Sequence, residues 1–497
     1  MNGLTFSKYI NENVFGTIPV TQTEFDLINT LAFQRLRNIK QLGLANLVFP
    51  AADHTRFSHS LGVMHIVGKM AERLYQLDVF SQEEIKKLRI AGLLHDIGHY
   101  PLSHLGEKVY MYQKPLRKPK GGQPFNSLEA ISGKSENEDA HHENIGKYVI
   151  QNRKEISNIL ERDNIDPVEI AKIIRAEHTN SIYGQLIHSG LDADRLDYLL
   201  RDSLHTGSKY GLVDLEYLLR SLEIKMGSNQ EQWVGISEKA IHAAEHFLMA
   251  RYFAYSQVTW HKTIRGFETI AGALFLDMRL GGHIYRDVNE IKQIVDDDEW
   301  LSFTDDYFYK ELAEYSEGNI NHIQQNLISC LKKRRRAKLI CEVKVFKEQD
   351  RDRKSEPYLK YKALYNLLHE KREKVNEVIA KHNIAHSLAF DQELNLNIDK
   401  VSGSNSFDDL SDENLKESIL IIGKNNIYPI TFDSSSILKP LSNRKLYCLR
   451  LYVVDPNPNL SVEDSDKFLQ PLMEEINKLY EEELNELTQE VTKALSL

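Results

Sequence analysis

Apolar residues recur at three- and four-residue spacings through most of residues 1–280, a pattern that predicts a mainly helical region. Thr21 and Glu24 have the spacing of a capping box, which predicts a helix that begins there and continues to Gly43. The same periodicity predicts further helices over residues 59–74, 145–152, 167–178 and 240–280.

A second capping box, at Ser81 and Glu84, predicts a helix that stops at Gly98. This helix places His95 and Asp96 side by side on its last, buried turn. A single histidine on an apolar face is more often a satisfied core residue than a ligand. A buried carboxylate, however, is costly unless a metal or another cation compensates its charge. The adjacent pair therefore favours a metal site at this helix end.

The pattern becomes mixed after residue 280. Strands are predicted over 341–346 and 446–454, helices over 358–382 and 471–495, and a polar linker over 391–417. Pro471 is expected in the first turn of its helix, where proline is tolerated. We therefore predict a helical core over 1–280 that carries the metal site, and an α+β region over 281–497.

An insertion at about 110–140 interrupts the helical core. It is rich in proline, glycine, lysine and serine, a composition that predicts a long loop. Long loops are usually functional or disordered. A lid beside the site and a disordered insert are both open interpretations.

Composition is that of an ordinary globular protein. Of the 497 residues, 41% are hydrophobic and 27% are charged. The net charge of −10, from 62 basic and 72 acidic residues, argues against a general nucleic-acid-coating role. No apolar stretch approaches a membrane-spanning length, and the N-terminus lacks a signal pattern. Three cysteines without zinc-type spacing make the cytoplasm the expected location.

Two histidines and two aspartates form a candidate metal set: His59, His95, Asp96 and Asp194. Mixed nitrogen and oxygen ligands suit a divalent ion such as Mn, Fe or Mg. Four protein ligands on an octahedral ion leave about two positions for water and a substrate oxygen. This arrangement is typical of a hydrolase.

The order of these ligands is the signature of the HD phosphohydrolase superfamily. Flanking blocks at 33–43, 56–62, 95–104 and 192–202 resemble those of the deoxynucleoside triphosphate (dNTP) triphosphohydrolases, over roughly residues 20–270. The resemblance implies a mainly α fold with a helical HD-domain core and a smaller mixed α+β C-terminal region. It also implies hydrolysis at the α-phosphate, which yields a deoxynucleoside and inorganic triphosphate.

The resemblance also implies roles for individual residues. It favours His104 as the general acid with Glu107 orienting it, His142 and Glu143 as catalytic support, and His99 beside the metal or the α-phosphate. It places Gln41 and Asp202 on the sugar 3′-hydroxyl, Tyr198 against the sugar, and Leu42 where a 2′-hydroxyl would lie. Arg56, Arg195 and Arg251 are the expected phosphate ligands, because the planar guanidinium binds phosphate in a bidentate manner.

Assembly and specificity are the least constrained expectations. The resemblance implies a homotetramer with an activating nucleotide, for which Arg37, Lys262 and residues 332–336 supply spare positive charge. The resemblance also gives residues 281–497 a role in oligomerisation or regulation. Asn29 stands where the mammalian enzyme of the family has an acidic activator-site residue. Residues 259–262 stand where that enzyme has a tyrosine against the sugar, a place that Thr259 or Trp260 would take. Two alternatives remain: an HD phosphatase acting on nucleoside monophosphates or cyclic nucleotides, and a non-catalytic HD protein that binds nucleotides or single-stranded nucleic acid. The intact metal set argues against the second.

Overall fold

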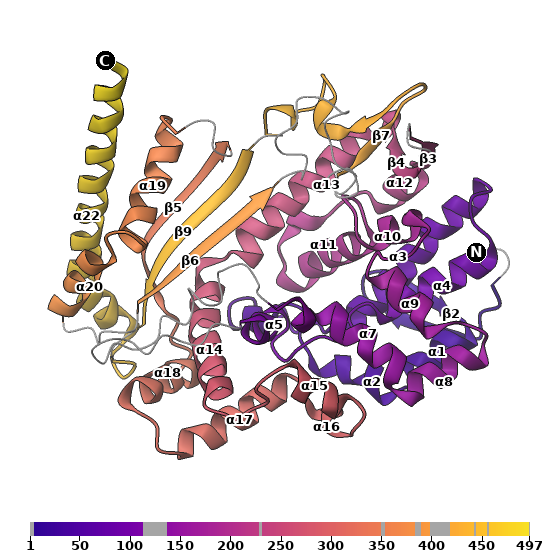
Figure 1. Cartoon of the computed structure of the whole chain (residues 1–497), viewed down its shortest axis with the longest axis horizontal. Coiled ribbons are helices and arrows are strands. Elements are labelled where there is room, and N and C mark those ends of the chain that lie inside the picture. Colours follow the sequence, from indigo (N-terminus) through magenta and orange to yellow (C-terminus); the bar gives the residue numbers. More distant parts are fainter. Residues whose placement is uncertain are drawn as a thin grey trace.

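The computed structural model describes residues 4–112, 137–227, 231–348, 353–382, 389–397, 418–441, 444–454 and 457–496. These residues form a mainly helical protein with three small sheets, which confirms the predicted fold class. Figure 1 shows the helical body on one side and the three-stranded sheet with its covering helices on the other. None of the described helices is both long and apolar enough to cross a membrane.

The centre of the helical body is a set of packed helices that carry the metal-set residues. Helix α3 (Arg56–Gln76) packs against α4 (Gln82–Leu94) and α11 (Ala193–Thr206). The apolar stripe predicted for α3 is buried along its length, from Val63 to Leu74. Helices α7 (His142–Asn152), α8 (Lys154–Arg162), α9 (Pro167–Ile174) and α10 (Ser181–Ile187) surround this centre.

The N-terminal segment differs from the single helix that the sequence predicted. A hairpin of β1 (Lys8–Glu12) and β2 (Gly16–Val20) precedes α1 (Gln22–Ile28), whose capping box at Thr21 is present. The predicted continuation to Gly43 is wrong. The side chain of Thr30 accepts the Phe33 N–H and begins a separate short helix, α2 (Leu31–Gln34), which is followed by a 3-10 turn.

The remaining helices of the body lead from the metal-set helices to the sheet region. They are α5 (His104–Met111), α12 (Leu215–Arg220), α13 (Ile241–Ala254), α14 (Lys262–Leu280), α15 (Val288–Val295), α16 (Glu299–Ser302), α17 (Asp305–Glu317) and α18 (His322–Lys332). The helix predicted over 240–280 is interrupted, because a π-helical turn at Tyr255–Thr259 separates α13 from α14. The predicted insertion lies mostly in 113–136, outside the described residues.

Two sheets bring distant segments together. Strands β3 (Leu222–Met226), β4 (Gln232–Ser237), β7 (Leu420–Ile422) and β8 (Ile427–Pro429) pair in that order, with β4 and β7 parallel. The other sheet places β9 (Arg444–Val453) between β5 (Lys338–Glu348) and β6 (Ala389–Asn397), all antiparallel. The linker predicted over 391–417 is therefore wrong at its start, which belongs to β6; residues 398–417 lie outside the described part.

Three helices pack beside this second sheet: α19 (Glu356–Leu368), α20 (Arg372–Lys381) and α22 (Val462–Ser496). They form a separate apolar core with β5 and β9 (Figure 1). The Ser461 hydroxyl accepts the Asp464 N–H, so α22 begins earlier than predicted and Pro471 lies inside the helix. The expectation that Pro471 stands in the first turn is wrong. The division near residue 280 stays a prediction.

Candidate active site

Three helix ends bring the metal-set residues together. His59 is in the first turn of α3 and Asp194 in the first turn of α11. Helix α4 ends at Leu94, earlier than predicted, so His95 is its C-cap and Asp96 lies just beyond the helix instead of on its last turn. A side chain at Gly98 would lie 2.1 Å from the Gly146 backbone nitrogen, so only glycine lets this turn pack against α7.

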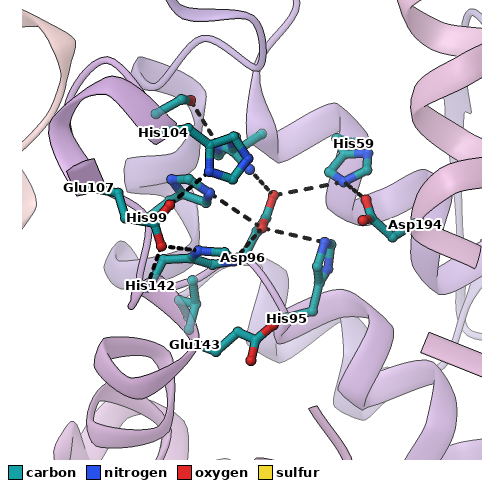
Figure 2. A network of polar contacts seen from close by, with 12 residues as sticks. His59, His95, Asp96, His99, His104, Glu107, His142, Glu143 and Asp194 are labelled. Atoms are coloured by element: carbon teal, nitrogen blue, oxygen red, sulfur yellow. Dashed lines mark hydrogen bonds and ion pairs between the residues drawn. The ribbon is translucent and has the colours of Figure 1, made fainter. Parts of the chain in front are cut away.

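The geometry of the set suits a divalent ion. His59 Nε2 lies 3.0 Å from Asp194 Oδ1 and 3.8 Å from Asp96 Oδ2, and His95 Nε2 lies 3.5 Å from Asp96 Oδ1. One ligand atom each of His59, His95 and Asp194 fall within 4.8 Å of one another. His95 Nε2 is buried and makes no hydrogen bond among the described groups; Figure 2 marks its 3.5 Å approach to Asp96 Oδ1, a position that fits a ligand nitrogen.

Both imidazoles are oriented by hydrogen bonds at their other nitrogen. His59 Nδ1 is 2.6 Å from Asp197 Oδ2, and His95 Nδ1 is 2.8 Å from the Gly92 carbonyl. Asp197 in turn accepts two hydrogen bonds from Arg201, which also pairs with Glu12 of the N-terminal hairpin. Sequence reasoning did not predict this series of hydrogen bonds. The only signal for it was the helical i, i+4 spacing of Asp197 and Arg201.

The pKa values of the metal-set residues depend strongly on one another's charges. Burial lowers the pKa of His59, but Asp194 and Asp197 outweigh burial and raise this pKa to about 10. Burial raises the pKa of Asp96, but Arg56 and the two ligand histidines outweigh burial and hold it well below its usual range. The set therefore offers ionised carboxylates, and a divalent cation would replace the proton on His59.

A second cluster lies on the other side of Asp96. The Glu107 carboxylate is 2.8 Å from Nδ1 of both His104 and His142, and it accepts the His142 backbone N–H. Burial raises the Glu107 pKa, but these two imidazoles outweigh burial and hold it well below its usual range. Burial lowers the pKa of His142, but Glu107 outweighs burial and raises it to about 9. The cluster can hold and deliver protons.

His99 lies between the two groups (Figure 2). Its ring stacks on His142 with 4.2 Å between centroids, and its Nε2 is 3.9 Å from Asp96 Oδ1. Both ring nitrogens are buried without hydrogen-bond partners in the described part of the chain. Burial lowers the pKa of His99 well below its usual value, and the nearby Arg56 lowers it further, so the ring is neutral.

Glu143 faces away from the Glu107 cluster. Its carboxylate lies 3.7 Å from His188 Nε2 and 4.0 Å from Arg175 Nη1. Its nearest contact toward the cluster is His141 Nδ1, at 3.8 Å. Glu143 therefore acts on the cluster through its charge, which helps to raise the pKa of His142, and its catalytic role stays a prediction.

The three predicted phosphate ligands differ in their surroundings. Arg56 binds Asp96 at 2.6 Å and the Ser103 hydroxyl at 2.9 Å, while its Nη2 is buried and unpartnered among described groups. Arg251 on α13 likewise has a buried Nε without a described partner. Arg195 instead donates to the Ser189 carbonyl. Arg56 and Arg251 thus retain N–H groups for a ligand.

The predicted sugar-contacting residues meet through His54, which sequence reasoning missed. His54 Nε2 is 2.8 Å from Asp202 Oδ1, and the His54 carbonyl accepts the Gln41 N–H at 3.0 Å. Gln41 Oε1 is buried without a described partner. Leu42 packs beside the small cluster formed by Ala45, Ala52 and Ile264.

Tyr198 and Trp260 have different environments. Tyr198 is half-buried on α11; burial raises its pKa well above the usual value, and Tyr255 raises it further. Trp260 is buried against Leu446 and Cys448 of β9, and its carbonyl accepts from Arg450. Trp260 therefore serves packing with the C-terminal sheet, and the expectation that Thr259 or Trp260 faces the sugar stays a prediction.

Comparison with known proteins agrees with this geometry. The chain matches the HD domain family over residues 56–202. It is 27% identical over 339 residues to the deoxynucleoside triphosphate triphosphohydrolase SAMHD1 of Danio rerio, covering 65% of this chain and 54% of that protein. The mouse protein of the same name is 33% identical over 218 residues, covering 40% of this chain and 32% of that protein.

An uncharacterized protein of Methanocaldococcus jannaschii is 33% identical over 332 residues, covering 64% of this chain and 62% of that protein. The chain thus spans about half to three fifths of the first curated relatives. Among solved structures, a phosphohydrolase from Bacteroides thetaiotaomicron has a TM-score of 0.60 at 24% identity, covering 89% of this chain and 99% of that one. This likeness shows the fold alone.

Proposed function

We propose that this protein is a metal-dependent HD phosphohydrolase that hydrolyses dNTPs at the α-phosphate. The products are a deoxynucleoside and inorganic triphosphate. The observation that carries the proposal is the position of Asp96, which belongs to the candidate metal set and lies 3.9 Å from His142 of the Glu107 cluster. The relatives named as dNTP triphosphohydrolases support the choice of substrate.

Metal binding and proton donation are assigned to different residues. His59, His95, Asp96 and Asp194 would hold a divalent ion, which supplies Lewis acidity at the α-phosphate and lowers the pKa of water. Cleavage between phosphorus and the 5′-oxygen leaves an alkoxide that requires a proton. His104 gives this proton, because its side chain is 61% exposed and Glu107 holds its Nδ1.

Substrate binding uses the unpartnered groups around the site. Arg56 and Arg251 donate to the phosphates through their free N–H groups. Gln41 and Asp202, tied together by His54, bind the 3′-hydroxyl. Arg195 uses Nη1 on the Ser189 carbonyl and its Nε lies 3.6 Å from Asp192, so Nη2 is the group that would bind a phosphate.

The test is the identity of the product. Protein loaded with Mn²⁺ or Mg²⁺ is incubated with each dNTP in ¹⁸O-enriched water, and the phosphates are separated by ion chromatography and mass. We expect inorganic triphosphate that carries the label, with Asp194→Ala as the inactive control. Pyrophosphate or single phosphates as the main product would overturn the proposal. Release of phosphate from nucleoside monophosphates alone would favour the phosphatase alternative.

A regulated homotetramer is the second part of the proposal. Arg334 donates to the Leu47 carbonyl, which places the basic run 332–336 beside the segment that follows Leu42. The pKa of His261 is lowered first by burial and then by Lys262, Arg450 and Arg336, so positive charge gathers there. An activating nucleotide would neutralise this charge.

A further inference from the structure

The loop that connects Asp96 to His104 is strained at its end. Leu102 has φ 58° and Ser103 has φ 57° with ψ −130°, and neither is glycine. Such left-handed conformations cost of order 1–3 kcal/mol and persist only when the surroundings hold them. Helix α5 begins immediately afterwards with His104. Whatever holds Leu102 and Ser103 therefore also sets the position of the proposed general acid.

The carboxylate of Asp305 holds this loop. Asp305 begins α17, well outside the residues that match the HD domain, and is 4% exposed. Its Oδ1 accepts the Leu102 N–H at 2.7 Å, and its Oδ2 accepts the Lys40 N–H at 3.0 Å. One carboxylate thus joins the strained loop to the segment that carries Gln41.

Ser103 extends the same connection to the phosphate-binding side. Its hydroxyl donates to the Lys40 carbonyl at 2.6 Å and accepts from Arg56 Nε at 2.9 Å. Asp305 therefore supports two groups that the reaction needs: His104, through the loop backbone, and Arg56, through the Ser103 hydroxyl.

The segment before α17 fixes the start of the same loop. Arg35 is 2% exposed, and its guanidinium stacks on Trp300 at 3.7 Å. It donates to the Phe303 carbonyl at 3.0 Å and to the His99 carbonyl at 2.6 Å. The loop is thus held at Leu102 by Asp305 directly and at His99 by Arg35, which residues 300–303 position, and the buried positive and negative charges of Arg35 and Asp305 favour each other.

From these contacts we propose that Asp305 is a positioning residue for phosphoryl hydrolysis: it fixes the Leu102–Ser103 turn so that His104 and Arg56 meet the α-phosphate together. This inference rests on the proposed function. It assigns a role in the active site to α17, which the HD match does not include. The matched HD segment alone, without α17, lacks the acceptor for the Leu102 N–H.

Asp305→Asn is the informative change because it keeps the shape of the side chain and alters the hydrogen bonds that this side chain can make. An asparagine side chain accepts through its oxygen, but its NH₂ group then faces one of the two backbone N–H donors. That donor is left buried and unpaired. Asp306→Asn is the matched control, since Asp306 is the next residue in the same first helical turn and is exposed. Both variants remove one charge from the helix N-terminus.

The experiment measures turnover and metal content together. For Asp305→Asn we expect kcat to fall about 10- to 100-fold, the effect of a small displacement of catalytic groups, with unchanged metal per chain. Amide exchange at Leu102 should become faster. Ser103→Ala, which cannot hold Arg56 or Lys40, should lower kcat similarly even if Asp305→Asn fails to fold. Asp306→Asn should match the wild type.

Three outcomes would overturn the inference: kcat of Asp305→Asn and Ser103→Ala equal to that of the control, loss of metal in proportion to the loss of turnover, or a rise in KM with kcat unchanged. A wild-type protein that releases no triphosphate from any dNTP refutes the proposed function instead. In that case the exchange rate at Leu102 still shows whether Asp305 holds the loop.

Discussion

Single side chains in the site are distinguished by what binds their Nδ1 atoms. His59 and His95 use this nitrogen on Asp197 and on the Gly92 carbonyl, and both present Nε2 to the metal position. His104 and His142 share Glu107 instead. Under the proposed function, the same residue type therefore acts as ligand or as proton carrier according to its hydrogen-bond partner.

Removing a ligand should remove the metal. In Asp194→Ala the ion loses one of two carboxylates, so we expect metal per chain, measured by plasma mass spectrometry after dialysis, to fall to background together with turnover. Glu216→Ala is the control, since this carboxylate is exposed and pairs with Lys69 away from the site. An active, metal-depleted Asp194→Ala protein would refute the metal set.

Removing the acid should separate chemistry from metal binding. His104→Ala should lower kcat by about 10²–10⁴-fold, the usual contribution of a general acid, with the metal retained. Glu107→Gln should lower kcat less, because the imidazole remains but loses its ionised partner. Normal kcat in His104→Ala would move the acid role to His142 or Glu107.

Acid sensitivity should come partly from His65. This buried residue of α3 has a pKa lowered to about 4, first by burial and then by Lys69 and Arg89. In the unfolded chain His65 binds a proton near pH 6.5, whereas in the folded protein it does so only near pH 4. The free energy of unfolding is therefore undiminished above pH 6.5 and falls as the pH is lowered from 6.5 toward 4. Between pH 7 and 5 the loss is about 2 kcal/mol. Denaturant titrations at pH 7 and 5 should show a loss of unfolding free energy that is about 2 kcal/mol smaller in His65→Phe than in the wild type. Equal losses in the two proteins would contradict the assignment to His65.

Helices α3 and α11 pack closely against each other beside the candidate metal site. A Cβ on Gly62 would lie 1.7 Å from Asp197 Oδ1 and 2.6 Å from Arg201 Nη2. The glycine leaves room for the carboxylate that orients His59. The metal position thus depends on the distance between two helices as well as on its ligands.

Gly62→Ala should therefore weaken metal binding without touching a ligand. Displacing Asp197 removes the partner of His59 Nδ1, a change that typically costs about 10- to 100-fold in metal affinity. Competition with a chelator measures this loss. Gly318→Ala is the control, because its Cβ would meet only the Tyr315 carbonyl, at 3.4 Å. Equal affinities in the two variants would exclude the packing argument.

Local signals predicted elements well where hydrogen bonding is local. The capping boxes at Thr21 and Ser81 are present as expected. The misses depend on contacts that sequence spacing does not carry. Thr30 divides a continuous apolar pattern, and β6 forms in a polar segment because it pairs with β9. The four ligand positions could be named from their motif, but Asp305 could not, since it reaches Leu102 only through tertiary packing.

Over the whole molecule, the proposed tetramer should respond to nucleotides. A nucleotide that bridges subunits stabilises the assembly that binds it and should raise turnover. We expect hydrolysis of one dNTP to accelerate when a second is added, together with a larger native mass. Hyperbolic kinetics without cross-activation, from a protein that stays monomeric, would contradict this expectation and leave the product assay unaffected.

The order of strands in the C-terminal sheet has a consequence for how the chain is made. Strand β9 lies between β5 and β6 but is synthesised after both. On the ribosome, β5 and β6 therefore emerge before their shared partner and expose unpaired backbone edges, which favours aggregation. We expect nascent chains that stop short of Arg444 to need chaperones, whereas α3, α4 and α11 are already complete by then.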